Sequence, residues 1–158
     1  KVNINEVIEE LFSIFKPEAQ KQNIALKANK SLNDNKLVVY TDRTKVTQIF
    51  TNLLSNALKF THEGFIELGY SVKNTSEPAI MEFYVKDSGI GMTTDQQKII
   101  FERFQQAHKS INKVYGGTGL GLSISKGFAE IMGGKIWVES EPDVGSTFYF
   151  TIPYKPAK

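Results

Sequence analysis

The sequence predicts an α/β fold in which helices cover one face of a mixed sheet. Segments with alternating apolar residues occur in adjacent pairs, as in hairpins, instead of alternating strictly with helices. The chain has 158 residues, of which 41% are hydrophobic and 23% are charged, and it shows no internal repeat and no break in composition. These properties indicate one domain, residues 1–158, that is large enough to bury a core.

The N-terminal segment predicts a helix followed by a hairpin. Apolar residues recur at helical spacing over Ile4–Phe15, and Pro17 is expected to kink this helix or to mark its end. The short segments Ile24–Asn29 and Leu37–Tyr40 flank the turn-forming sequence Asn33-Asp34-Asn35, so we expect them to pair.

The rest of the chain predicts three helices and two further hairpins. Asp42 is a suitable N-cap for a helix of roughly Arg43 to Phe60. The segments Phe65–Val72 and Ile80–Lys86 alternate as strands do. The elements expected after them are a short helix from Thr93 or Thr94 to about Phe101, a polar loop over Gln105–Tyr115, a helix over 120–131 that ends at Gly133-Gly134, and a hairpin of Ile136–Ser140 with Ser146–Ile152.

Charge, cysteine content and hydropathy exclude several classes of function. The net charge is only +2 and no long run of Lys and Arg occurs, which argues against a nucleic-acid partner. The absence of cysteine excludes disulfides and thiolate metal sites. No apolar stretch approaches the roughly 20 residues that span a bilayer, and no signal peptide is visible. Because the chain begins at Lys1 and a helical pattern follows at once, we expect a fragment of a longer protein.

The central helix combines an apolar stripe with a polar one. Asn52, Asn56 and Lys59 project from the same side, within roughly 60° of one another. An amide oxygen can ligate Mg²⁺ without adding charge, and an ammonium can neutralise a phosphate. Every amphipathic helix has a polar face, so this pattern alone also fits an ordinary solvent-facing surface. The apolar stripe consists of Val46, Ile49, Phe50, Leu53, Leu54, Ala57 and Leu58.

Three of the glycine-containing loops are considered as parts of a binding site. Asp87–Gly91 follows a strand and offers a carboxylate acceptor suited to an exocyclic amine, although the same residues fit an ordinary turn. Gly116–Leu122 runs straight into a helix, where exposed N–H groups favour phosphate; a glycine-rich linker is the alternative. Gly145–Phe148 by itself is a turn before a strand. Because the P-loop, Gly-x-Gly-x-x-Gly and protein-kinase signatures are absent, any phosphate binding must use another architecture.

Together these segments resemble, in order and spacing, the motifs of sensor histidine kinases. The resemblance runs from about residue 4 to residue 153 and implies a two-layer α/β sandwich, the Bergerat fold shared with DNA gyrase and MutL-type ATPases, with a mixed, mostly antiparallel sheet. The matching motifs are the N box at Asn52–Thr61, the first glycine box at Asp87–Gly91, the F box at Phe101–Phe104 and the second glycine box at Gly117–Leu122.

The resemblance implies that the domain binds ATP and Mg²⁺. Asp87 would receive the adenine amino group beside Gly89 and Gly91, and Thr147 would support that contact, while Phe60 would flank the ring. Asn56 would ligate Mg²⁺, and Asn52 and Lys59 would contact the metal or the phosphates. The residues expected to wrap the phosphates are Gly117, Thr118, Gly119, Leu120 and Gly121. The polar loop corresponds to an ATP lid at about 105–117; Gln106 stands where many relatives have Arg, which leaves Lys109 and Lys113 as candidate basic contacts.

The resemblance further favours a kinase over an ATPase. Hydrolysing relatives carry a Glu general base where this chain has Asn52, so activation of water should be poor, and Asn52 and Lys59 are the catalytic candidates. The nucleophile of the family is a His on a separate helical domain, and neither His62 nor His108 lies in such a motif. The expected partners are the dimerisation and histidine-phosphotransfer domain of the same parent protein and, downstream, a response regulator receiver domain. The fragment itself is expected to be a monomer and a cytoplasmic domain, whose parent can carry a membrane anchor.

Three alternatives remain open at this point. One is a hydrolysing ATPase or conformational clamp of the same fold, which Asn52 argues against. Another is a non-enzymatic ATP-binding signalling module, which the intact motifs argue against. A third is an anti-sigma-type serine kinase, which would be expected to keep the Glu that Asn52 replaces.

Overall fold

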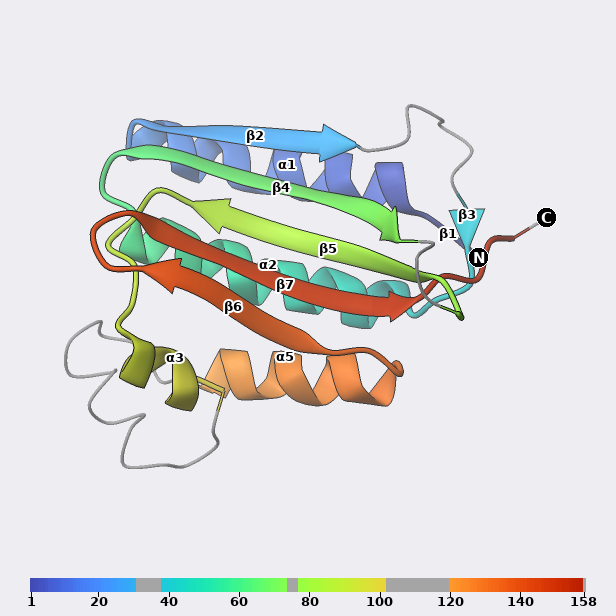
Figure 1. The fold of residues 1–158 in the computed structure, drawn as a ribbon. Coiled ribbons are helices and arrows are strands. Elements are labelled where there is room, and N and C mark those ends of the chain that lie inside the picture. The colour runs from blue at the N-terminus through green and yellow to red at the C-terminus, as the bar shows by residue number, and fades with distance from the viewer. Residues whose placement is uncertain (31–37, 74–76, 102–119, 158) are drawn as a thin grey trace.

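The computed structural model describes residues 1–30, 38–73, 77–101 and 120–157. One layer is a five-stranded sheet in the order β2-β4-β5-β7-β6, and α1, α2 and α5 cover one of its faces (Figure 1). The elements are β1 (Val2–Asn3), α1 (Ile4–Lys21), β2 (Ile24–Lys30), β3 (Val38–Val39), α2 (Arg43–Phe60), β4 (Gly64–Lys73), β5 (Ile80–Asp87), α3 (Thr94–Ile99), α5 (Leu120–Ile131), β6 (Ile136–Glu141) and β7 (Gly145–Pro153).

The predicted two-layer architecture is confirmed. Strand β2 pairs with β4 in parallel, and the β4–β5, β5–β7 and β6–β7 pairs are antiparallel, so the sheet is mixed and mostly antiparallel. None of the helices in the described part of the chain has the length and hydropathy needed to cross a membrane.

The predicted hairpin between Ile24–Asn29 and Leu37–Tyr40 is wrong. Strand β2 pairs with β4, and β3 joins the N-terminal β1 in a separate two-stranded sheet. The pairing of Val2 with Val39 buries both side chains, a long-range gain that local turn chemistry cannot reveal.

Helix α1 does not end at Pro17 but continues to Lys21. Pro17 and Ser13 both lie on the exposed side of the helix, where water can reach the Ser13 carbonyl that proline leaves without a donor. Ala19, which is buried, anchors the last turn against the domain.

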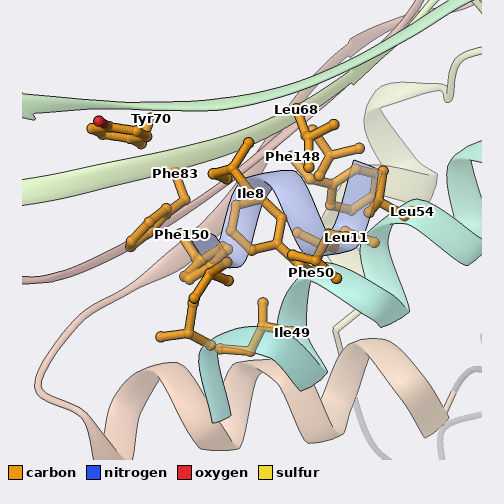
Figure 2. Packing of buried hydrophobic residues seen from close by; sticks show 14 of the residues in the cluster. Ile8, Leu11, Ile49, Phe50, Leu54, Leu68, Tyr70, Phe83, Phe148 and Phe150 are labelled. Carbon is orange, nitrogen blue, oxygen red and sulfur yellow. The ribbon is translucent and has the colours of Figure 1, made fainter. Parts of the chain in front are cut away.

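The core forms where α2 lies against the sheet. All seven residues of the predicted apolar stripe of α2 are buried. Phe50 meets Phe83 and Phe150 edge to face, with ring centroids 5.4 Å and 5.1 Å apart (Figure 2). Asp42 caps the helix by accepting a hydrogen bond from the Lys45 amide. This packing fixes α2 under β5 and β7, so its polar stripe has a defined position.

Candidate functional site

Asp87 ends β5 as a buried carboxylate. Side chains alternate along the strand, and Asp87 continues the row of Phe83 and Val85 that faces the helices. Its Oδ1 accepts hydrogen bonds from the main-chain N–H groups of Gly89 (2.9 Å) and Ser146 (3.3 Å), and neither bond uses Oδ2. Burial raises the pKa of this carboxyl, while the two hydrogen bonds oppose the rise. The strand end therefore presents a fixed acceptor that is only 6% exposed.

The structure places Ser146, not Thr147, beside Asp87. In the β5–β7 register Asp87 pairs with Ser146 and Lys86 pairs with Thr147. Because side chains alternate, Thr147 lies with Lys86 on the helix-free face, opposite to the Asp87 side chain. The expected support of Asp87 by the Thr147 side chain is thus corrected: the adjacent strand supplies the Ser146 N–H instead.

The loop after β5 packs against the C-terminal end of α2. Ile90 donates its N–H to the Phe60 carbonyl oxygen at 3.2 Å. A Cβ on Gly89 would stand 2.4 Å from that same oxygen, so only glycine allows this approach. Gly91 has a φ of +68°, and a Cβ there would clash with the Glu141 carbonyl. The first glycine loop and the end of α2 therefore form one surface.

Thr61, the C-cap of α2, contributes a group that sequence reasoning did not assign. It is 1% exposed, and its Oγ1 has no hydrogen-bond partner, the one such buried side-chain atom in the described part of the chain. The Cβ position of Gly89 lies 2.9 Å from this oxygen and 3.0 Å from Asp87 Oδ1, so both oxygens border the same point. A buried hydroxyl without a protein partner is suited to a hydrogen bond with a bound water or a ligand atom. Its position as the last residue of the Asn52–Thr61 motif was the available signal.

The polar stripe of α2 connects this loop with α5. Asn52 lies against the first turn of α5, where its Nδ2 donates to the Gly121 carbonyl oxygen at 3.0 Å. Asn56 and Lys59 follow one and two turns later on the same side; Asn56 is partly buried and Lys59 is exposed. Phe60, also partly buried, follows Lys59 and contacts the Gly89 loop through its main-chain carbonyl oxygen. The end of β5, the end of α2 and the start of α5 lie at one end of the molecule (Figure 1).

The structure thus brings together most of the predicted site residues that it describes. Asp87, Gly89 and Phe60 meet directly, and Asn52 meets Gly121. The remaining predicted phosphate-binding and lid residues, Gly117, Thr118, Gly119, the lid at about 105–117 and its Lys109 and Lys113, lie outside the described residues, and Leu120 is described only as the first residue of α5.

Comparisons with known proteins agree with this geometry. Residues 41–156 match the family model described as histidine kinase-, DNA gyrase B-, and HSP90-like ATPase. The sensor protein GacS of Pseudomonas syringae pv. syringae is 36% identical over 157 residues, which are 99% of this chain and 17% of GacS. The sensor histidine kinase WalK of Bacillus subtilis is 39% identical over 126 residues, 80% of this chain and 20% of WalK. The chain therefore spans about a fifth of the length of these relatives.

Two solved structures share the fold along almost the whole chain. Full-length ShkA in complex with AMPPNP matches with a TM-score of 0.83 and 29% identity, covering 99% of this chain and 31% of that one. Histidine kinase ThkA in complex with the response regulator protein TrrA matches with a TM-score of 0.75 and 30% identity, covering 98% and 41%. The chain belongs to the histidine kinase-, DNA gyrase B- and HSP90-like ATPase family, and within it to the ATP-binding domains of sensor histidine kinases.

Proposed function

We propose that this domain binds ATP with Mg²⁺ and presents the γ-phosphoryl group to a histidine on a separate dimerisation domain of its parent protein. The observation that carries the proposal is the contact between the Gly89 loop and the end of α2. It joins a buried acceptor, Asp87, to a row of amides and an ammonium along one helix. Such a site offers one end to a purine amine and the other to phosphates.

The residues at the purine end fit an adenine. Asp87 Oδ2 accepts from an exocyclic amine, and Phe60 offers an apolar flank at the same loop. Thr61 Oγ1 supports the fit, because this buried hydroxyl lacks a partner beside Asp87. A ligand amine, ring nitrogen or bridging water would satisfy it.

The residues at the phosphate end fit a metal shared with the ligand. In the described part of the chain no three His, Asp or Glu side chains gather into a metal site. Mg²⁺ commonly takes few protein ligands and completes its shell with phosphate oxygens and water. We assign Asn56 as its protein ligand, Lys59 as the cation that neutralises a phosphate, and Gly121 with 117–120 as the phosphate-binding backbone. When bound, Mg-ATP supplies the phosphoryl group that is transferred.

Two features favour transfer to another protein over hydrolysis. Asn52 has no carboxylate that could take a proton from water, and its amide N–H groups are engaged with α5. His62 follows α2 in an exposed bend and not in a helix, so it does not resemble the expected phosphoacceptor. Catalysis by this chain would rest on positioning and charge neutralisation. The ThkA complex supports a response regulator receiver domain as the downstream partner.

The test combines this domain with a separately made helical dimerisation domain and ATP labelled at the γ-phosphate. Acid-labile, base-stable label on the helical domain would indicate phosphohistidine. Steady release of phosphate by this chain alone, without label on the partner, would refute the kinase assignment and support a hydrolysing ATPase. Nucleotide binding without either outcome would support a non-enzymatic signalling module.

A further inference from the structure

Asn52 uses the nitrogen of its side-chain amide, not the oxygen, in its close contacts. The nitrogen donates to the Gly121 carbonyl oxygen at 3.0 Å and to Ser125 Oγ at 2.9 Å. A main-chain carbonyl only accepts, so the atom that faces Gly121 must be the nitrogen. The oxygen meets the exposed Gln48 amide at 3.4 Å, a long hydrogen bond. A metal ligand would have to use that oxygen.

The two acceptors lie one turn apart on α5. Ser125 is fully buried, so its hydroxyl depends on partners inside the protein. Gly121 stands close above the amide, because a Cβ there would be 3.6 Å from Asn52 Cγ. In the observed orientation the oxygen lies beside Gln48, one turn before Asn52, whereas the assigned metal ligand Asn56 lies one turn after it. Flipping the amide would set that oxygen against the Gly121 carbonyl and take a donor from Ser125. The geometry therefore favours a fixed bridge between α2 and the first turn of α5.

We propose that Asn52 is a positioning residue that holds the first turn of α5 in place, and that it affects nucleotide binding through Gly121 and not as a ligand of Mg²⁺. This inference rests on the proposed function, since Gly121 belongs to the assigned phosphate-binding backbone. It replaces the expectation that Asn52 contacts the metal or the phosphates. It also gives the N box a second task, which is to set the relative position of two helices.

The discriminating substitution is Asn52→Asp, which keeps the shape and the oxygen but replaces the donor by a second oxygen. Binding of a non-hydrolysable ATP analogue is measured by calorimetry with Mg²⁺ and with EDTA. We expect Asn52→Asp to weaken binding about tenfold, by the same factor in both buffers, because the carboxylate repels the Gly121 carbonyl. Ser125→Ala should weaken binding in the same direction. The control Gln48→Ala removes only the exposed contact and should stay within about twofold.

A metal ligand would behave in the opposite way. Retained or stronger Mg²⁺-dependent binding by Asn52→Asp, with no effect of Ser125→Ala, would overturn the inference while leaving the proposed function intact. Absence of nucleotide binding by the unsubstituted chain would overturn the proposed function and this inference with it.

A double-mutant cycle of Asn52→Ala and Ser125→Ala in urea unfolding needs no nucleotide. The bridge predicts non-additive effects, with the double variant less destabilised than the sum of the single variants. Strict additivity would refute the bridge.

Discussion

Replacing Asp87 by Asn should lower the affinity of this domain for nucleotide without lowering its stability. The amide oxygen of Asp87→Asn can still accept from the N–H groups of Gly89 and Ser146, so the loop should keep its geometry. The amide nitrogen, however, puts a donor where an adenine amine needs an acceptor. A hydrogen bond to a charged group contributes about 1.5–3 kcal/mol, so affinity should fall roughly 10- to 150-fold.

The same substitution should not destabilise the free fold. Because burial raises the pKa of Asp87, the folded chain holds this proton more tightly than the unfolded chain does. Stability contributed by this group is therefore lost as pH rises through the folded pKa, and at neutral pH the buried charge is a net cost. Removing the charge should leave the melting temperature unchanged or raise it.

Calorimetric titration with a non-hydrolysable ATP analogue and thermal melts of the free protein measure the two effects. Glu82→Gln is the matched control, since it makes the same carboxylate-to-amide change on β5 but on the helix-free face. Lowering the pH through the folded pKa of Asp87 should weaken binding by the unsubstituted chain, and Asp87→Asn should lack this dependence. Wild-type affinity in Asp87→Asn, or an equal loss in Glu82→Gln, would show that Asp87 does not contact the nucleotide.

Three further predictions follow from single contacts. Gly89→Ala puts a Cβ 2.4 Å from a main-chain oxygen, so it should lower the free energy of unfolding, measured in urea, by about 1–3 kcal/mol. Gly127→Ala on α5 is the control: its Cβ meets nothing within 4 Å, so it should raise the free energy of unfolding by about 0.5–1 kcal/mol. Equal effects of the two substitutions would contradict the packing of the Gly89 loop. Thr61→Val removes a buried hydroxyl that has no partner, so it should stabilise the nucleotide-free fold by about 1 kcal/mol. It should also weaken nucleotide binding, and unchanged affinity would mean that the hydroxyl does not contact the nucleotide. Burial and the hydrogen bond to Glu67 raise the pKa of Tyr84 to about 12, so this tyrosine should ionise late in an ultraviolet titration. Glu67→Gln should lower the pKa of Tyr84, and the same pKa in Glu67→Gln as in the unsubstituted chain would refute the contact.

Much of the fold could be predicted because its signals are local. The helix over Arg43–Phe60 has its cap at Asp42, and the spacing of its apolar residues defines which face is buried. The strand pairs β4–β5 and β6–β7 are neighbours in sequence, so a short connection suffices to predict them.

The predictions that were wrong concern strand pairing and strand phase, which long-range packing determines. Which strand lies beside Ile24–Lys30 depends on β4, more than 30 residues away in sequence, and not on the turn chemistry nearby. The wrong assignment of Thr147, in place of Ser146, as the residue beside Asp87 has a similar cause. A glycine-containing turn leaves the phase of the following strand open by one residue, and a shift of one residue moves every side chain to the other face.

In the site, the sequence predicts what a residue type can do chemically but not which contacts the side chain makes. Asn in place of a carboxylate at position 52 already argues, from sequence alone, against a general base. Sequence cannot show which end of that amide is engaged, because the answer depends on α5, whose Ser125 lies 73 positions further along the chain. Because both donors are committed to α5 and the Asn52 oxygen lies beside Gln48, the oxygen of Asn56, one turn further along the helix, is the better candidate for a metal. The two asparagines of one motif then have different tasks, one structural and one chemical, and substitutions that exchange donor for acceptor are the way to tell them apart.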